Sequence, residues 1–371
     1  MSRFSLTERE QYKLEIARMR SHIMELTMST LRNFNFRRTI ISHGWYGLLP
    51  FSLDTEKWQL ARVLDVGPKP PVTIFLTGHK DHVRVDVSRN LNKTETDIVL
   101  RDARHILRLD DDLQSFYLSI AGDPEFGWIG EQGAGRLLRS PTVYEDLVKM
   151  ICTTNCSWAL TVKMVTGLVQ NLGRETKEGR RSFPTPEAMA AMPADFYVDE
   201  VRAGYRAPYL KELADRVASG ELDVEQWVKS DLPTAELAKQ IKGVKGAGNY
   251  AAENLLKLLG RYDGLALDSW TRMRFFQIRN KGRKATDKKI ARYYSRFNEW
   301  RALVRRDTGL VGIGKQAGAA HRSRFTTPVP APAPAPAPAP ATVLLIENQR
   351  RVLRAAWAFA VSHHRQHVSV G

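Results

Sequence analysis

The sequence has little cysteine, no long apolar run and too few acidic residues to balance its basic ones. Its 371 residues include two cysteines, Cys152 and Cys156, and two thiols exclude a disulfide scaffold, a four-cysteine iron–sulfur cluster and a Cys₄ zinc site. The apolar runs fall well short of the roughly 18 residues needed to cross a bilayer. The N-terminus is interrupted by charges and lacks the apolar core of a secretory signal. We therefore expect an intracellular protein without membrane spans.

The charge balance favours a polyanionic partner. Lys and Arg total 56 against 40 Asp and Glu, a net charge of +16, and a surplus of this size points first to nucleic acid. Residues 306–371 carry eight basic and two acidic residues, so removing them still leaves +10. The part of the chain expected to fold is therefore basic on its own account.

The pattern along the chain predicts a mainly α fold with a small antiparallel β domain, an α+β class. Residues 7–32 approximate one apolar helix face, and Val83, Val85 and Val87 alternate with polar residues as in a half-buried strand. After about residue 100 the pattern is helical. We expect an N-terminal helical segment at 1–40, the β domain at 41–125, a helical domain at 126–305 and a basic Pro/Ala-rich, disordered tail at 306–371.

Local signals predict where some helices start. Ser140 with Pro141 is typical of a cap followed by the first helical position, and Thr185 with Pro186 repeats the pattern. A further helix is expected over 235–242. The first of these helices should bury one face, made of Tyr144, Leu147, Val148 and Ile151.

The most informative stretch is a predicted helical hairpin, in which TAELAKQIK and NYAAENLLKLLG flank the turn GVKGAG. The second helix has an apolar stripe, made of Ala252, Leu255, Leu256 and Leu259. Gly243, Gly246 and Gly248 allow positive φ and leave backbone amides open at a helix N-terminus, which suits a phosphate. Alternatively, the glycines serve only the turn.

An aspartate follows the hairpin at the end of the loop GRYDGLALDSW. Asp268 directly precedes another helical pattern. An aspartate there is commonly an N-cap, worth about 1 kcal/mol. Its position after a predicted phosphate-binding hairpin also makes it a candidate for chemistry.

The hairpin, the aspartate after it and several upstream blocks of the sequence resemble a known protein family. The order helix, GVKGAG, helix, LALDSW is similar to the helix–hairpin–helix superfamily of base-excision DNA glycosylases, in which an aspartate sits just after the hairpin. RLLRSPTVYEDLVKMICTTNCSWALTVKMVTGLVQNLG, FPTPEAMAAM and AGYRAPYL resemble successive blocks of the 8-oxoguanine DNA glycosylase branch. The likeness covers roughly residues 40–305.

The resemblance implies an enzyme that rotates a damaged nucleotide out of duplex DNA and cleaves its N-glycosidic bond. Asp268 would be the catalytic carboxylate, stabilising a cationic sugar and activating water. Where the family's strand-cutting members carry a Schiff-base lysine, this sequence has Tyr250, and a phenol cannot form an imine. A monofunctional glycosylase is therefore expected, with Lys245 in the turn directed at phosphate rather than replacing that lysine.

The same comparison assigns further roles. Asn155 would insert into the duplex beside the flipped base, or else simply cap or cross between two helices. Tyr250 and Trp270 would lie at the base pocket, although either could be a core residue. The DNA phosphates would contact the hairpin turn through Gly243, Lys245, Gly246 and Gly248. Basic residues after Asp268 would neutralise further phosphates or form a solvated face, and they include Arg272, Arg274, Arg279, Lys281, Arg283, Lys284, Lys288 and Lys289.

Other features are left as alternatives. The substrate is an alkylated purine such as 3-methyladenine or else 8-oxoguanine, with a slight preference for the former. The match ends near FNEWRALV, so the tail could leave the pocket incomplete, and the alternative function is a catalytically impaired DNA-binding protein that keeps the hairpin. We expect a monomer with no cofactor. No metal is assigned to the cysteines or to His363, His364 and His367, and a cation at the hairpin is left open.

Overall fold

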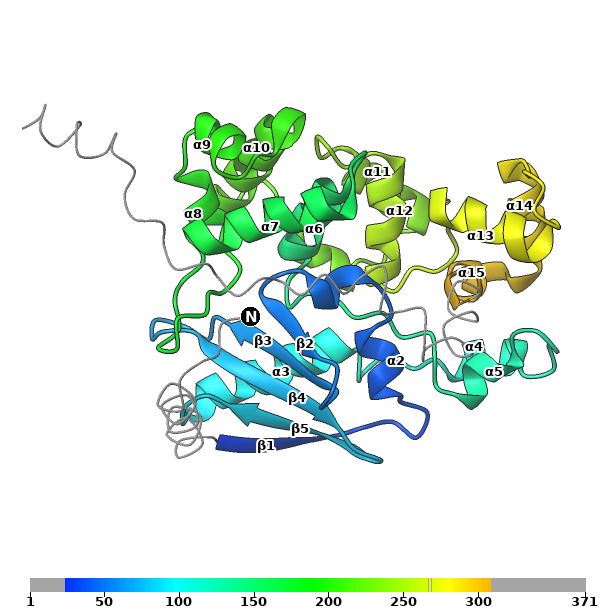
Figure 1. The fold of residues 1–371 in the computed structure, drawn as a ribbon, viewed down its shortest axis with the longest axis horizontal. Helices are drawn as coiled ribbons and strands as arrows, with labels where there is room; N and C mark the ends of the chain where they lie inside the picture. The colour runs from blue at the N-terminus through cyan, green and yellow to red at the C-terminus, as the bar shows by residue number, and fades with distance from the viewer. Residues whose placement is uncertain (1–23, 266, 268, 308–371) are drawn as a thin grey trace, which may run out of the picture. The chain divides into compact units, whose positions relative to one another are not determined.

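The computed structural model describes residues 24–265, 267 and 269–307, with the backbone alone described at 269, 270 and 305–307. Within these residues a β-sheet forms one layer and a row of helices lies along it (Figure 1). No helix in this part of the chain is long and apolar enough to cross a lipid bilayer. The fold is mainly α with a small antiparallel sheet, as predicted.

The sheet described here is five-stranded and antiparallel throughout, in the order β1-β5-β4-β3-β2. Leu76 pairs with Leu60 on one side and Val85 on the other, and all three side chains are fully buried. Val83 and Val87 are buried on the same face of β5, which confirms the predicted alternation. The strands are β1 Met24–Ser29, β2 Phe51–Asp54, β3 Gln59–Leu64, β4 Val72–Gly78 and β5 His82–Val87.

The helix predicted over 7–32 is wrong where the structure describes it. Residues 24–29 form β1, which pairs with β5 so that Leu26 lies opposite Val85. The apolar positions of this stretch fit both the period of a helix and the period of a strand. Pairing with β5 decides the outcome, because it satisfies the backbone hydrogen bonds of an edge that would otherwise be open. Residues 7–23 of the predicted helix lie outside the described residues.

The helices follow the predicted pattern more closely. Thr185 caps α8 with Pro186 in the first turn, as predicted. The predicted start at Ser140 is two residues early, because Thr142 caps α6 by accepting from the amide of Glu145. The helices are α2 Phe36–Ile40, α3 Lys93–Leu107, α4 Gln114–Ile120, α5 Gly127–Glu131, α6 Val143–Thr153, α7 Trp158–Leu172, α8 Pro186–Ala190, α9 Ala194–Asp199, α10 Ala207–Ala218, α11 Thr234–Lys242, α12 Asn249–Leu258, α13 Ser269–Arg279, α14 Asp287–Tyr294 and α15 Arg301–Asp307.

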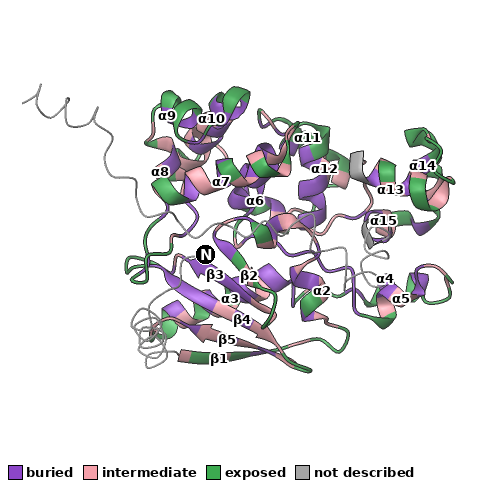
Figure 2. Cartoon of the chain, viewed as in Figure 1, coloured by how far each residue is buried: buried purple, intermediate pink, exposed green. Residues whose placement is uncertain are grey.

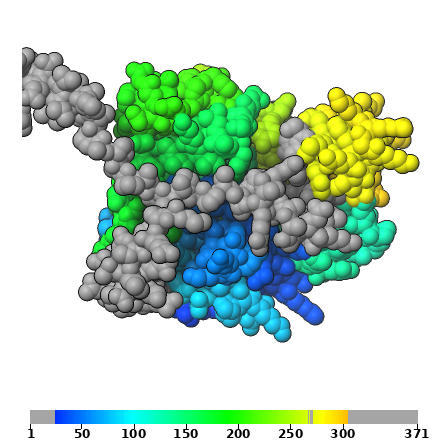
Figure 3. All heavy atoms as spheres, viewed as in Figure 1, coloured from blue at the N-terminus to red at the C-terminus, as the bar shows by residue number. Residues whose placement is uncertain are grey.

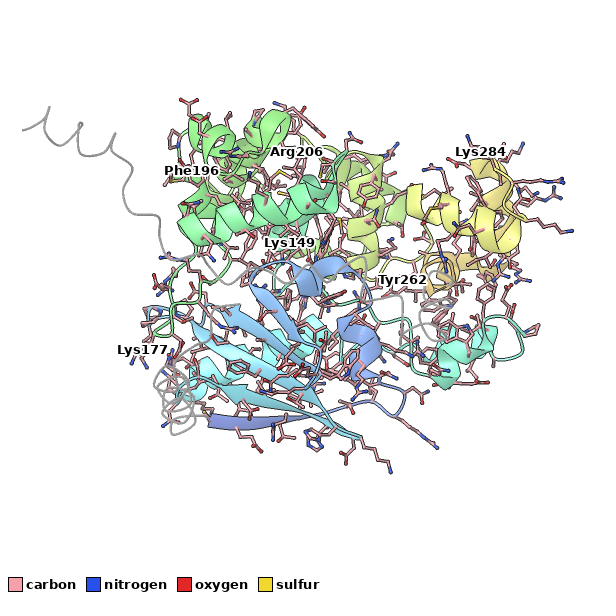
Figure 4. All side chains as sticks on the ribbon, in the orientation of Figure 1. Lys149, Lys177, Phe196, Arg206, Tyr262 and Lys284 are labelled. Carbon is pink, nitrogen blue, oxygen red and sulfur yellow. The ribbon has the colours of Figure 1, made fainter. Side chains whose placement is uncertain are left out.

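Helix α6 joins the two layers, and Figure 2 shows it largely buried, like α12. The predicted face, Tyr144, Leu147, Val148 and Ile151, is buried as expected. A buried ion cluster fastens α6 to the sheet: Arg62 of β3 donates to both carboxylate oxygens of Glu145, at 2.7 and 2.6 Å. Lys149 donates to the same carboxylate at 2.6 Å (labelled in Figure 4).

The charges in this cluster set the ionisation of its carboxylate. Burial alone would raise the pKa of Glu145, but the neighbouring charges of Arg62 and Lys149 lower it to about 2. Glu145 therefore stays ionised and fixes the position of α6. The loop that follows this helix carries Asn155.

The described residues form two apolar clusters. The larger combines the buried sheet face with α3, α6, α7, α10, α11 and α12. The smaller gathers α4, α5 and α13–α15 around side chains such as Phe116, Phe275 and Phe297, and includes Tyr262. The segment that leads from α12 toward α13 therefore passes from one cluster to the other.

Candidate functional site

Helices α11 and α12 form the predicted hairpin. Leu237 and Ile241 of α11, with Ala252 and Leu255 of α12, are buried in the larger cluster. The apolar stripe predicted for α12 is thus confirmed, because Leu256 and Leu259 are buried as well. Burying both helices leaves the turn between them at the surface.

The three glycines of the turn differ in role. Gly246 has φ +86, and a Cβ there would come within 2.9 Å of the Tyr209 ring, so both backbone and space require glycine. Gly243, with φ −66, caps α11, and Gly248, with φ −65, precedes α12. The prediction that the glycines supply positive φ therefore holds for Gly246 alone.

The N-terminus of α12 is open. Gly248 supplies no side-chain cap, and Gly248, Asn249 and Tyr250 are exposed. The amides at the start of a helix have no intrahelical partner, and the helix dipole adds partial positive charge there. This arrangement can accept an anion by its backbone without reading anything else about the ligand.

Lys245 lies on the same turn and is exposed. Its Nζ donates to Glu212 Oε2 of α10 at 2.6 Å. An exposed pair of this kind is worth at most about 1 kcal/mol. The lysine can therefore exchange its carboxylate for another anion at small cost.

Tyr250 stands in the first turn of α12 with 39% of its surface exposed. On the same face, Asn254 donates to the Tyr250 carbonyl at 2.8 Å, and Lys257 Nζ donates to Asn254 Oδ1 at 2.7 Å. Lys257 is only 2% exposed. The structure thus adds a buried amine to the helix face that carries Tyr250.

Asn155 occupies the loop between α6 and α7. It is exposed and has φ +45, a conformation that asparagine tolerates better than most residues. The neighbouring Thr154 is fixed by Arg206, which donates from Nη2 to its carbonyl and from Nε to its hydroxyl at 3.2 Å. Arg206 is buried between α6 and the start of α10 (Figure 4). Arg206 therefore holds the loop in place next to Asn155, whose side-chain amide faces solvent.

An exposed aromatic stands beside this loop. The Tyr205 hydroxyl lies 3.4 Å from both oxygens of Thr154, and 52% of Tyr205 is exposed. Its ring covers the Arg206 guanidinium at 4.3 Å. A large aromatic ring that is exposed and held in place by its neighbours is suited to stacking on planar ligands.

Asp268 lies outside the described residues. The predicted helix after it is present, since α13 begins at Ser269, and Leu265 and Leu267 before it pack against the smaller cluster. The side chain of Trp270 also lies outside the described part. The geometry of both residues stays a prediction.

The end of α12 is held by two buried arginines. Arg108 Nη1 donates to the Leu258 carbonyl at 2.6 Å, and Arg139 Nη1 donates to the same oxygen at 3.2 Å. Asp111 pairs with Arg108, and the Tyr262 ring lies 5.8 Å from its guanidinium (labelled in Figure 4). These contacts position the start of the segment that leads to Asp268.

Tyr205, Arg206, Lys257 and Arg108 have no role predicted from the sequence. Tyr205 and Arg206 occur in the block AGYRAPYL, which resembles the family as a whole without indicating a role for either residue. Lys257 could have been found by helical spacing, since it is seven residues from Tyr250. Arg108 has no local signal, because its partner is 150 residues away.

The described residues include no group of three or more His, Cys, Asp and Glu side chains able to hold a metal ion. Cys152 is buried, with its thiol pKa raised to about 12 by burial. Cys156 donates to the Cys152 carbonyl at 3.1 Å. His363, His364 and His367 lie outside the described part.

The sequence is similar to that of a known DNA repair enzyme over part of its length. A yeast (Saccharomyces cerevisiae) N-glycosylase/DNA lyase is 24% identical over 172 residues, which cover 43% of this chain and 45% of the yeast protein. The chain therefore matches less than half the length of that relative.

Two solved structures share the fold. A 3-methyladenine DNA-glycosylase from Archaeoglobus fulgidus superposes with TM-score 0.62 at 18% identity, covering 77% of this chain and 99% of its own. An 8-oxoguanine glycosylase/lyase from Clostridium acetobutylicum, in complex with double-stranded DNA containing cytosine opposite 8-oxoguanine, superposes with TM-score 0.61 at 18% identity, covering 79% and 98%. Both likenesses concern the fold.

The fold is that of the helix–hairpin–helix DNA glycosylases. Residues 148–303 match the model of the HhH-GPD superfamily base excision DNA repair proteins.

Proposed function

We propose that this protein is a DNA N-glycosylase of base-excision repair, which takes a damaged purine out of duplex DNA and hydrolyses its N-glycosidic bond. The open N-terminus of α12, presented by the Gly246 turn within the segment that matches the HhH-GPD superfamily model, is the observation that carries the proposal. Its amides suit a backbone phosphate of the duplex. The protein is proposed to act as a monomer.

Asp268 is the proposed catalytic residue. Cleavage leaves cationic character on the sugar, and a carboxylate close to C1′ stabilises it and activates the attacking water. Support comes from its place in the sequence, directly before α13 and after the segment held by Arg108. Holding both ends of this segment would restrict where the carboxylate can lie.

A monofunctional reaction is proposed from Tyr250. The phenol occupies the aligned position of the family's Schiff-base lysine and cannot form an imine. The yeast relative is named an N-glycosylase/DNA lyase, so strand cutting is the alternative that an experiment must separate. Lys245, exposed, and Lys257, buried, are the amines of the hairpin that would be tested if cutting were found.

Asn155 is proposed to enter the duplex in place of the flipped nucleotide. Its exposed amide can pair with the base left behind, and Tyr205 beside it can stack on a neighbouring base. Tyr250 and Trp270 are proposed to contact the flipped base. The basis for Asn155 is the rigid loop, and for Tyr250 it is exposure next to the open end of α12.

An alkylated purine such as 3-methyladenine is the preferred substrate, with 8-oxoguanine as the alternative. Alkylated purines carry positive charge and leave readily, so a carboxylate and aromatic contacts can suffice. The fold itself is shared with glycosylases of both kinds.

The test is single-turnover cleavage of duplexes that each carry one damaged base, analysed with and without alkali. Alkali reveals abasic sites that a monofunctional enzyme leaves intact. The proposal predicts base release from an alkylated duplex and strand breaks only after alkali. Binding without base release from any duplex would mean that the hairpin serves a DNA-binding protein that has no glycosylase activity.

A further inference from the structure

More than half of the chain's net charge lies in one short segment. Residues 271–301 contain eleven Lys and Arg against two acidic residues, a net charge of +9 out of +16. This segment covers most of α13, the turn after it, α14 and the short 3₁₀ helix Ser295–Trp300 that follows. Figure 3 shows the atoms of these two helices, in yellow, at the molecular surface.

Several arginines of the segment are committed to structural pairs. Arg279 forms an ion pair with Glu125, which also accepts from the Tyr293 hydroxyl at 2.6 Å. Arg296 pairs with Asp123 at 3.2 Å. These contacts attach α13 and α14 to the acidic end of the α4–α5 connection.

Four further cations gather on the turn between α13 and α14 and in the first turn of α14. Lys281, Arg283, Lys284 and Lys288 are exposed, and in the described part of the chain no carboxylate lies within salt-bridge distance of any of the four. Lys284 stands at the outer edge of the segment (labelled in Figure 4). Four exposed, unneutralised cations in eight residues repel one another, a cost that a polyanion would remove.

The turn is held in one shape. Asn280 Nδ2 donates to the carbonyls of Arg283 and Lys284 at 2.7 and 3.0 Å, and Lys289 Nζ donates to Asn280 Oδ1 at 2.8 Å. Lys281 and Gly282 take positive φ, +49 and +76. Charged residues that only contact solvent do not require hydrogen bonds that fix the backbone. A surface that binds a regular polyanion loses less conformational entropy on binding if its backbone is already ordered.

We infer that this basic turn, Lys281, Arg283, Lys284 and Lys288, is a second binding surface for the phosphate backbone of duplex DNA, separate from the hairpin. The inference rests on the proposed function for the identity of the polyanion. The hairpin offers backbone amides at one helix end, while the basic turn offers side-chain cations to phosphates elsewhere on the duplex. It contacts no base, so it strengthens binding to damaged and undamaged DNA alike.

The experiment compares two fourfold variants of the full chain. One is Lys281→Gln, Arg283→Gln, Lys284→Gln and Lys288→Gln. The matched control makes the same charge change at exposed lysines of the sheet layer and its connections, Lys57→Gln, Lys80→Gln, Lys93→Gln and Lys177→Gln. Binding of an undamaged duplex is measured by fluorescence anisotropy across a range of salt concentrations, with thermal unfolding to check both folds.

Each phosphate contact contributes about 0.9 to the slope of log affinity against log salt. The inference predicts that the turn variant reduces this slope by about 2 to 4, while the control keeps it near the wild-type value. An unchanged slope in the turn variant, or equal losses in both variants, would overturn the inference. Base release from a damaged duplex is measured for the wild type and for the matched control, which should release the base at the wild-type rate. If neither releases a base but the slopes still differ, the proposed enzyme fails and the binding surface stands.

Discussion

Arg108 Nη1 donates to the carbonyl oxygen of Leu258 over 2.6 Å, although 150 residues separate them in the chain. The guanidinium is buried and also pairs with Asp111. One side chain thus satisfies the end of α12 and connects it to the end of α3. The hairpin is fastened at the end opposite its open turn.

Replacing Arg108 with methionine should lower the free energy of unfolding by about 3 kcal/mol, because it leaves the Leu258 carbonyl and the Asp111 carboxylate without this donor. Urea unfolding measures the change. Arg104→Met is the control, since Arg104 is in the same helix but makes an exposed pair with Asp110, and it should cost at most about 1 kcal/mol. Equal losses of unfolding free energy in the two variants would show that the buried contacts of Arg108 contribute no more to stability than the exposed pair of Arg104.

Stability should also depend on pH through His105. Burial, together with the charges of Arg139 and Arg108, lowers the pKa of His105 to about 3. The unfolded value is about 6.5, so the folded state excludes a proton that the unfolded state binds. This contribution is present above pH 6.5 and is lost as pH falls from about 6.5 toward 3, at up to about 1.4 kcal/mol per pH unit.

The matching measurement is urea unfolding of wild type and His105→Gln at about pH 7 and about pH 5. The variant should lose less stability than the wild type between these two values. The same loss in both proteins would mean that His105 does not titrate differently on folding.

Asn155→Gly separates the two roles weighed for Asn155. Glycine removes the amide yet accepts φ +45 without strain, so thermal unfolding should be little changed. If the amide enters the duplex, single-turnover base release should fall by about tenfold or more, as for loss of about 1.4 kcal/mol of transition-state binding. A variant as active as the wild type would leave Asn155 only the role of linking α6 and α7.

Tyr250→Lys tests the proposed reason for a monofunctional reaction. The new amine, in the exposed first turn of α12, should allow borohydride to trap a covalent complex with abasic DNA, because an imine can then form at C1′. Wild type should give no trapped complex. Trapping by wild type would contradict the proposal, and Lys245→Met and Lys257→Met would then identify the amine responsible.

Patterns with short-range causes were predictable, whereas long-range ones were not. The Val83 strand and the α12 stripe follow from periods of two and 3.6 residues, and both are confirmed. Strand β1 was missed because its pairing with β5 joins residues nearly 60 apart. The bracing of the Asn155 loop by Arg206 depends on a contact across 52 residues, which no local pattern encodes.

The most direct test of the proposed enzyme compares Asp268→Asn with Asp263→Asn in single-turnover release of an alkylated purine. Asp263 lies in the same connecting segment, so it undergoes the same chemical change five residues away. The account predicts that Asp268→Asn slows release by about 100-fold or more while duplex binding persists, and that Asp263→Asn stays close to wild type. Release by Asp268→Asn at the wild-type rate would contradict it.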